Sequence, residues 1–365
     1  MEKKLAFGCM RLPMKGQEVD YDEFNRMIDY YMEQGFNYFD TAHGYLDGKS
    51  ETAIRDCLAA RYPRESYILT DKLTEDYFKR EEDIIPFFES QLKATGVEYF
   101  DYYLMHSQTK NNYDHFMKCN AYKVGEQLKR EGRIKHLGIS FHDKADFLER
   151  ILNEHPEVEI VQIQFNYLDY EDSSIESRKV YEVCRRFNKP VLIMEPVKGG
   201  GLAKLPAPAE KVLADLGTGA SPASYAVRFA ASFDGVYKVL SGMSDLSQMK
   251  DNVSYMKDFV PFKQEEYDAV KKVCEIMNNT DEIPCTACRY CTAGCPKQIS
   301  IPDLFSCYNA RIRFNDWNSA FYYDISTGGK GKASDCIQCR QCEHVCPQHL
   351  PITDCLKKVA AVFEK

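Results

Sequence analysis

The chain has 365 residues, of which 44% are hydrophobic, and its formal net charge is −8. At roughly 100–200 residues per domain, this length predicts two domains, or one barrel with an appendage. The acidic balance argues against nucleic acid as a partner, because phosphate binding needs clustered positive charge. Residues 1–16 lack the apolar run of a signal peptide, and no stretch approaches the ~18–20 apolar residues of a spanning helix. We therefore expect a soluble cytoplasmic protein that does not bind membranes.

Up to about residue 260, short apolar or β-branched runs alternate with amphipathic helical patterns. The expected strands cover residues 5–9, 36–39, 67–70, 102–105, 135–139, 160–165, 191–194 and 236–240. The expected helices include residues 21–34, 81–95, 116–130, 144–152 and 174–187. Eight such alternations predict a closed (β/α)8 TIM barrel, an α/β fold that we place in residues 1–280. A doubly wound sheet is the alternative, but its Gly-rich first turn is absent.

Residues 198–216, after the seventh expected strand, are rich in Gly, Pro and Ala. We expect them to form a long loop over the active face of the barrel, where the loops that follow barrel strands lie. Residues 262–278 predict a further charged helix, and residues 281–284 predict a linker. A second, smaller domain is therefore expected at residues 281–365.

The cysteines of this second domain carry the strongest signal in the sequence. Fifteen cysteines are present, an odd number that argues against a closed set of disulfides. Eight of them form two runs of the pattern C-x2-C-x2-C-x3-C-P: Cys285, Cys288, Cys291 and Cys295, then Cys336, Cys339, Cys342 and Cys346. Zinc sites usually combine C-x2–4-C pairs across a longer gap, so this spacing favours two [4Fe–4S] clusters over zinc.

The segment resembles bacterial-type two-cluster ferredoxins, in which the fourth cysteine of each run binds the other cluster. The resemblance implies a small α+β ferredoxin-like domain. On that pattern, one cluster takes Cys285, Cys288, Cys291 and Cys346, and the other takes Cys336, Cys339, Cys342 and Cys295. A 40-residue insert separates the two runs and carries an aromatic-rich helical stretch, residues 304–323, with the only tryptophan, Trp317. The insert either docks onto the barrel or a partner, or forms a local lid over the clusters.

Polar residues follow successive strands of the expected barrel. Asp40, Lys72 and His106 come at the carboxyl ends of the second, third and fourth strands, and Tyr45 follows Asp40 in the same loop. Barrel enzymes keep their catalytic groups on this rim. Each residue alone has a structural explanation, as a helix cap, a surface charge or a loop histidine, but four together favour a site.

These residues resemble the aldo/keto reductase family through residues 39–45 (FDTAHGY), 70–72 (TDK) and 104–106 (LMH), within a likeness that covers about residues 1–260. The resemblance implies an oxidoreductase that reduces an aldehyde or ketone, or oxidises an alcohol, with NAD or NADP. It assigns Tyr45 as general acid, Lys72 as the adjacent cation, Asp40 as the carboxylate that holds Lys72, and His106 as the residue that orients the carbonyl. We expect the ammonium to draw the pKa of Tyr45 down toward neutrality.

On the cofactor side, the resemblance implies contacts from residues at or after the last four strands: Ser140, Gln162, Met194, Gly242, Ser244, Gln248 and Asn252. Met194 stands where the family commonly has an aromatic residue, and Phe141 where it commonly has Asn. Gly242 and Gln248 replace cations that grip the 2′-phosphate of NADP in many relatives. These replacements favour NAD over strict NADP use, although Lys250 lies nearby in the sequence.

Electron counting leaves several functions open. Hydride transfer moves an electron pair whereas each cluster passes one electron, so a flavin is an open expectation although no flavin-specific motif is present. The leading hypothesis is a nicotinamide-dependent oxidoreductase with electron-transfer clusters, acting on a small carbonyl or alcohol and served by a redox partner protein. The alternatives are a ferredoxin-coupled or flavin-assisted oxidoreductase without a working dinucleotide site, a non-catalytic electron carrier, and clusters that serve only as structural staples.

Overall fold

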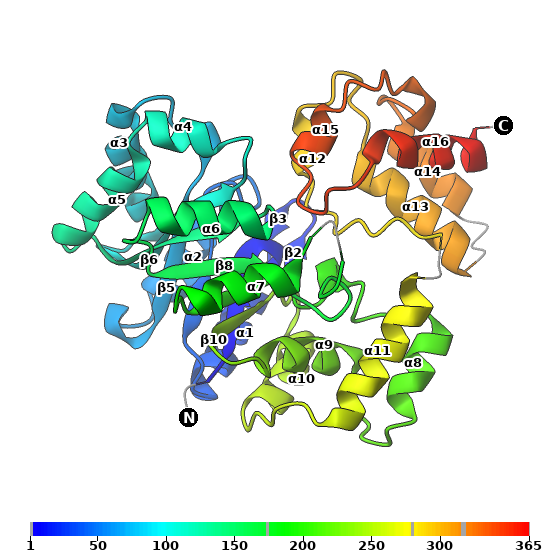
Figure 1. Cartoon of the computed structure of the whole chain (residues 1–365), viewed down its shortest axis with the longest axis horizontal. Helices are drawn as coiled ribbons and strands as arrows, with labels where there is room; N and C mark the ends of the chain where they lie inside the picture. The colour runs from blue at the N-terminus through cyan, green and yellow to red at the C-terminus, as the bar shows by residue number, and fades with distance from the viewer. Residues whose placement is uncertain (1–2, 173–174, 279–280, 315–318, 365) are drawn as a thin grey trace. The chain divides into compact units, whose positions relative to one another are not determined.

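The computed structural model describes residues 3–172, 175–278, 281–314 and 319–364. Eight parallel strands close into a barrel in the order β1-β10-β9-β8-β7-β6-β5-β4 (Figure 1). These strands are β1 (Leu5–Gly8), β4 (Tyr38–Asp40), β5 (Ile68–Leu73), β6 (Phe100–Gln108), β7 (Ile134–Phe141), β8 (Ile160–Gln164), β9 (Val191–Met194) and β10 (Val236–Ser241). The predicted TIM barrel is confirmed, and each expected strand overlaps one of the eight.

The barrel is filled by side chains that point inward from different strands. Six of them form one buried cluster: Ala6, Tyr38, Leu104, Ile160, Leu192 and Leu240. Above this packed layer, the strand register places Ser140 opposite Gln162 and Asp40 opposite Gly8. Since all eight strands are parallel, these residues share the carboxyl end of the barrel.

Amphipathic helices surround the strands. They include α1 (Tyr21–Glu33), α2 (Lys49–Ile54), α3 (Glu81–Thr95), α6 (Ala145–Glu154), α7 (Ser177–Arg186), α9 (Pro222–Ala231) and α10 (Leu246–Met256). Helix α1 is typical: Asp20 caps it by accepting a hydrogen bond from the Glu23 amide, and its buried residues recur at helical spacing. A short hairpin, β2 (Met14–Lys15) and β3 (Glu18–Val19), was not predicted.

The helix expected at residues 116–130 is instead two helices, α4 (Tyr113–Lys118) and α5 (Ala121–Arg130). The helical conformation is interrupted at Asn120, whose φ of 52° is left-handed. Asn tolerates this conformation better than most residues, which permits a sharp turn inside a continuous amphipathic pattern.

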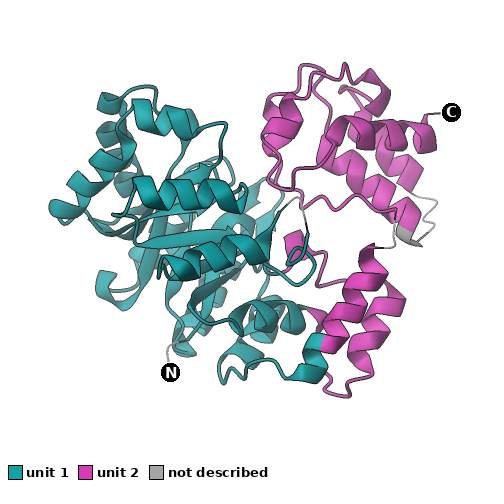
Figure 2. Ribbon diagram, viewed as in Figure 1, with its two compact units in different colours: residues 1–196, 223–267 teal, residues 197–222, 268–365 magenta. Residues whose placement is uncertain are grey.

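The chain divides into two compact units (Figure 2). Residues 1–196 and 223–267 form the first unit, and residues 197–222 and 268–365 form the second. The segment expected as a long loop after β9 belongs to the second unit and contains a 3-10 turn (Lys198–Gly200) and α8 (Ala207–Ala214). The segment expected as a long loop therefore includes a helix. Its prolines precede or begin α8, where a missing amide hydrogen costs nothing.

In its described residues, the second unit contains helices and no strand, whereas the α+β expectation included strands. Its helices are α8, most of α11 (Gln264–Asn278), α12 (Tyr290–Ala293), α13 (Ile301–Phe314), α14 (Ser319–Thr327), α15 (Gln341–His344) and α16 (Ile352–Phe363). Part of the insert packs locally, because Tyr323 stacks on Phe363 with ring centroids 4.7 Å apart. Trp317 lies outside the described residues. Among the helices that are described, none is both long and apolar enough to cross a membrane.

Candidate active site and cluster sites

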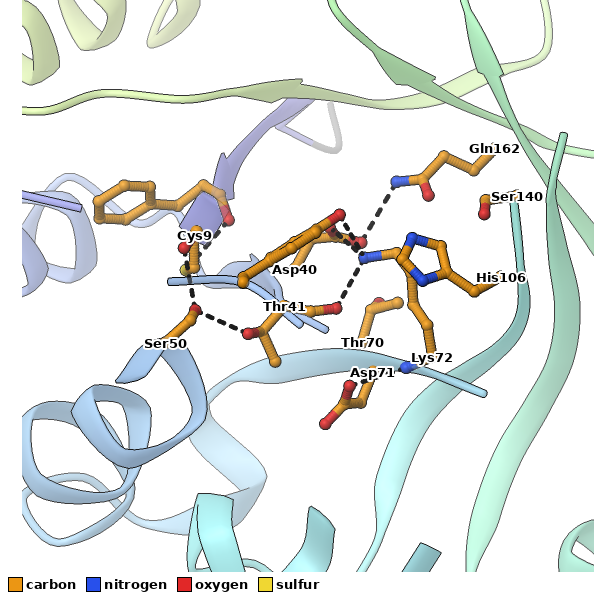
Figure 3. Close-up of polar contacts among 12 residues, drawn as sticks. Cys9, Asp40, Thr41, Ser50, Thr70, Asp71, Lys72, His106, Ser140 and Gln162 are labelled. Carbon is orange, nitrogen blue, oxygen red and sulfur yellow. Dashed lines mark hydrogen bonds and ion pairs between the residues drawn. The ribbon is translucent and has the colours of Figure 1, made fainter. Parts of the chain in front are cut away.

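A buried lysine joins the polar groups at the carboxyl end of the barrel. Lys72 on β5 is fully buried, and its Nζ donates to Asp40 Oδ1 at 2.7 Å and to the Thr41 carbonyl at 2.6 Å (Figure 3). The same ammonium lies 3.3 Å from the Tyr45 hydroxyl. Burial raises the pKa of Asp40, and the positive charge of Lys72 counters this effect. The structure thus brings three of the four predicted catalytic residues into direct contact.

The pKa of Tyr45 is higher than the sequence predicts. Burial raises its pKa well above 10.0, and the carboxylates of Asp40 and Asp71 add to the rise. The prediction that Lys72 draws this pKa toward neutrality is wrong, because burial and negative charge outweigh the nearby ammonium. The phenol is therefore protonated at neutral pH and is set up as a proton donor.

His106, at the end of β6, completes the predicted set. Its ring meets that of Tyr45 edge-on, with centroids 6.1 Å apart. Burial, with the charge of Lys72 and of His142 adding to it, lowers the pKa of His106 well below 6.5, so the imidazole is neutral. Nδ1 lies 2.6 Å from Thr74 Oγ1, and this hydrogen bond fixes the orientation of the ring. Sequence reasoning missed Thr74, which stands two residues beyond Lys72.

A chain of hydroxyl groups holds the loop that carries Tyr45. Ser50 on α2 donates to the Cys9 carbonyl at 2.9 Å, so the hydroxyl hydrogen of Thr41 is directed to Ser50 at 2.7 Å (Figure 3). The Thr41 and Ser50 hydroxyls therefore each donate one hydrogen bond. This arrangement ties the loop after β4 to the turn after β1.

The backbone of Lys72 is held from behind by Gln91 on α3. Gln91 Nε2 donates to the Lys72 carbonyl and to Asp71 Oδ1, both at 3.0 Å, and Asp71 Oδ1 also accepts from the Lys72 amide at 2.8 Å. Tyr103 fixes the amide of Gln91 by donating to its Oε1 at 2.6 Å. Burial and the neighbouring Glu51 carboxylate raise the pKa of Asp71 well above 3.8. Sequence reasoning missed this support because its members are far apart in the chain.

Ser140 and Gln162, predicted for the cofactor, lie on adjacent strands (Figure 3). Ser140 Oγ accepts a hydrogen bond from the Ser107 amide at 2.7 Å, and Gln162 Nε2 donates to Asp40 Oδ2 at 3.2 Å. A serine hydroxyl that accepts in this way still has its own hydrogen to donate, and a glutamine amide has both an oxygen and a second hydrogen. The pair therefore offers the complementary groups that a carboxamide requires. Met194 ends β9, opposite Gln164 on β8.

Three further predicted cofactor residues gather at the start of α10. Gln248 Oε1 accepts from the Ser244 amide at 3.0 Å, and Asn252 Nδ2 donates to the Gln248 carbonyl at 2.9 Å. Asp245 caps the helix by accepting from the Gln248 amide at 2.8 Å. Ser244, Gln248 and Asn252 thus form one hydrogen-bonded turn after β10.

Arg11 is a cation beside this turn that sequence reasoning did not single out. Ser244 Oγ donates to the Arg11 carbonyl at 3.0 Å, and a Cβ added to the exposed Gly242 would lie 3.8 Å from Arg11 Cβ. The charge of Arg11 also lowers the pKa of Tyr45, against the larger effect of burial. Its signal in the sequence was its position directly after the first strand of the barrel.

The eight clustered cysteines surround two cavities. The first is lined by Cys285, Cys288, Cys291 and Cys346 together with residues that include Thr286, Arg289 and Gln348. The second is lined by Cys295, Cys336, Cys339 and Cys342 together with residues that include Lys297, Ile337 and Arg340. In each cavity, three cysteines come from one run and the fourth comes from the other.

The backbone repeats itself around the two cavities. Left-handed residues occur at matching places in the two runs: Ala287, Arg289 and Gln298, then Gln338, Arg340 and His349. Left-handed residues of this kind turn backbone amides inward to form anion-binding concavities. The Ala287 amide already donates to Cys285 Sγ at 3.4 Å.

The donor set fits clusters better than single ions. Across the part of the chain that is described, no three His, Cys, Asp or Glu side chains converge to hold one metal ion. Four cysteine sulfurs spaced around a cavity suit a larger anionic group. The geometry therefore agrees with iron–sulfur ligation and disfavours zinc.

Comparison with known proteins assigns both parts of the chain. A model of the aldo/keto reductase family matches residues 4–275. The chain belongs to the aldo/keto reductase family. A 4Fe-4S dicluster domain follows this reductase domain at residues 284–352, as the predicted fusion requires.

The curated relatives match limited parts of this chain. Human aldo-keto reductase family 1 member C3 is 31% identical over 167 residues, which are 41% of this chain and 50% of that protein. Aldo-keto reductase AKR2E4 of Bombyx mori is 25% identical over 171 residues, 44% of this chain and 54% of that protein. The chain thus spans about half the length of these relatives.

Solved structures show the same fold. Aldo-keto reductase AKR11C1 from Bacillus halodurans, in its holo form, superposes with a TM-score of 0.59 at 24% identity, covering 74% of this chain and 91% of that one. An aldo/keto reductase from Klebsiella pneumoniae, in complex with NADP and acetate, gives a TM-score of 0.61 at 15% identity, covering 76% and 95%. At these identities the likeness concerns the fold alone.

The depressed pKa of His106 predicts an acid sensitivity of the fold. Below its ordinary pKa of 6.5, this histidine takes up a proton in the unfolded chain but not in the folded one, so stability falls as the pH falls. Urea unfolding should show His106→Gln losing less stability than the wild type between pH 7.5 and 5.5, by roughly 1 kcal/mol.

His136 on β7 is the matched control, because its side chain is 44% exposed. His136→Gln should retain the acid loss of the wild type. An acid loss in His106→Gln as large as in the wild type would show that His106 is not held neutral in the fold.

Proposed function

We propose that this chain is an oxidoreductase that reduces a carbonyl group, or oxidises an alcohol, with a nicotinamide cofactor. The observation that carries the proposal is the buried contact among Lys72, Asp40 and Tyr45, with His106 beside it. Membership of the aldo/keto reductase family and the carboxamide-compatible pair of Ser140 and Gln162 support it. NADP in the Klebsiella pneumoniae structure supports a nicotinamide cofactor here.

In this mechanism, a bound nicotinamide supplies hydride to the carbonyl carbon or takes it from the alcohol. The carbonyl oxygen gains negative charge as hydride arrives, and Tyr45 donates its phenolic proton to that oxygen. The raised pKa of Tyr45 suits this direction, because the phenol is fully protonated before the reaction. Neutral His106 orients the oxygen with a ring N–H.

Lys72 acts once the proton leaves Tyr45. Its ammonium, 3.3 Å from the phenol oxygen, stabilises the phenolate that forms. Asp40 and the Thr41 carbonyl hold the ammonium in place before and after this step. The pair Ser140 and Gln162 would hold the carboxamide, while Met194, Gly242, Ser244, Gln248 and Asn252 would cover the rest of the cofactor.

NAD suits the turn after β10 better than strict NADP use, because Gly242 and Gln248 carry no charge. Side-chain carbons of Arg11 nevertheless lie beside Gly242, so one positively charged residue belongs to the same region as an NADP phosphate would. The substrate is a small aldehyde, ketone or alcohol.

We assign two [4Fe–4S] clusters to the two cysteine-lined cavities. Each cluster would carry one electron at a time and would exchange it with a redox partner protein. The domain boundary that suits this division is residue 281, between the two family matches.

Tyr45→Phe tests the proton-donor role. This change keeps the ring beside His106 but removes the proton, so carbonyl reduction should fall by about 10²–10⁴-fold. Activity is measured as oxidation of NADH or NADPH with a panel of aldehydes and ketones, and the visible absorbance of the clusters should be unchanged. Tyr77→Phe is the control, because Tyr77 is a nearby phenol that is 40% exposed and contacts His43. Full activity in Tyr45→Phe would refute the assignment.

The shared ligation of the clusters makes a separate prediction. Cys295→Ser should damage the cluster held with Cys336, Cys339 and Cys342 and leave the other intact, so iron content should fall by up to about half. EPR of the reduced protein identifies which signal is lost. Cys307→Ser is the control, since Cys307 lines neither cavity. Loss of the other cluster in Cys295→Ser would overturn the crossed arrangement.

A second candidate is an oxidoreductase whose barrel uses a flavin or the clusters in place of a dinucleotide. The observation that favours it is Met194 at the end of β9, where the family commonly has an aromatic residue that covers the nicotinamide. Anaerobic titration with NADH and then NADPH separates the candidates. If the leading proposal holds, either nucleotide binds and supports carbonyl reduction; if neither binds and flavin bands are present, the second candidate replaces it.

A further inference from the structure

The two cysteine-lined cavities are related by the internal repeat, but their surroundings differ. Thr286, between the first two cysteines of its run, is 3% exposed, whereas the matching Ile337 is 58% exposed. Gln348, two residues after Cys346, is 4% exposed, whereas the matching Lys297 is exposed. The first cavity is therefore covered where the second is open.

The cover comes from the turn Lys198–Gly200, which belongs to the same compact unit (Figure 2). A Cβ added to Gly199 would lie 2.7 Å from the Thr286 carbonyl oxygen and 2.8 Å from Thr286 Cα. Only glycine therefore fits, and its φ of 64° also favours glycine. The turn packs directly on the first cysteine run.

Lys198 extends from this turn to the other segment of the first cavity. Its Nζ donates to Gln348 Oε1 at 2.8 Å, and Lys198 itself is 8% exposed. The backbone of Lys198 is left-handed, with φ of 47°, a conformation that non-glycine residues rarely adopt. Lys198 thus has an unfavourable backbone conformation. Its buried ammonium is held on Gln348, which lines the first cavity.

A buried cation has a specific effect on an iron–sulfur cluster. A [4Fe–4S] cluster with four thiolates is an anion, and it becomes more negative when it takes up an electron. Net charge, hydrogen bonds and solvent exposure together set its reduction potential. A buried ammonium stabilises the reduced form more than an exposed lysine does, because solvent screens the exposed charge.

We propose that Lys198 is a positioning residue and charge partner for the first cluster, the one expected on Cys285, Cys288, Cys291 and Cys346. The inference rests on the proposed cluster sites and goes beyond them. Lys198 orders the chain at Gln348 and raises the reduction potential of the first cluster. The second cavity has no such cover among the described residues, since Ile337 and Lys297 face solvent there. The two clusters therefore differ in potential, and the difference depends on Lys198.

An EPR-monitored redox titration of the holoprotein tests this inference. Dithionite supplies one electron to each cluster, and the wild type should show two one-electron steps, of which the first cluster's step is missing in Cys288→Ser. Lys198→Met should shift that step alone to more negative potential, with about a tenfold change in the ratio of reduced to oxidised cluster, which corresponds to about 59 mV. Lys198→Arg keeps the positive charge, so the first cluster's step should stay close to its wild-type potential.

Lys204→Met is the matched control, because Lys204 is an exposed lysine in the same segment; both of its steps should stay at the wild-type potentials. Iron analysis shows whether Lys198→Met assembles its clusters. If it does not, Gln348→Glu serves instead: it keeps an acceptor for Lys198 but neutralises the ammonium, and the same step should move in the same direction.

Two results would overturn the inference: a first-cluster step that does not move in the variant that assembles, or an equal shift of both steps. Absence of iron from the wild-type protein would refute the proposed cluster sites instead, so the two failures are distinguishable.

Discussion

The barrel site depends on one buried positive charge. Lys72 is fully enclosed, and an ammonium in such a place is costly unless oppositely charged and polar groups surround it. Asp40 and the Thr41 carbonyl meet that need at 2.7 and 2.6 Å, and the loop that provides them also carries Tyr45. Gln91 and Asp71 fix the backbone from the opposite side. The lysine thus determines where the phenol lies and limits how far the loop can move.

The second unit depends on its cysteine-lined cavities. Its cavities are lined by sulfur, a poor packing partner unless a cluster occupies the space, so its fold and its cofactors are interdependent. Amides presented by left-handed residues accompany each cysteine run. The apolar core beneath, with Leu304, Phe305 and Val359 fully buried, gives these loops a rigid base. The two cysteine runs, which repeat the same backbone pattern, pack against a single apolar core.

Much of this architecture is readable from the sequence. Strand positions follow from short apolar runs with turns between them, and the closed barrel follows from their number. The cysteine runs indicate their chemistry because their spacing brings three sulfurs of each run to one cavity, and the fold adds the fourth from the other run. Asp40, Lys72 and His106 could be found because the carboxyl ends of parallel strands share one rim.

Other features depend on contacts between distant residues and escape such reasoning. The pKa of Tyr45 reflects the sum of burial and several charges, and no local pattern reveals that sum. Thr74 and Gln91 act through contacts with His106 and Lys72 that only the fold creates. Helix α8 was hidden by prolines that look like loop residues until the start of the helix is known.

The second unit is assembled from two separate stretches, residues 197–222 and 268–365, with the last barrel strand and helix α10 between them. During synthesis the ribosome releases the first stretch before its partner exists, while β10 closes the barrel. The first stretch can therefore pack only once residues 268–365 have been made. For the same reason, a fragment cut at the linker would leave residues 197–222 without the surface they pack on, and the ferredoxin-like part cannot be exchanged between proteins as a simple tail.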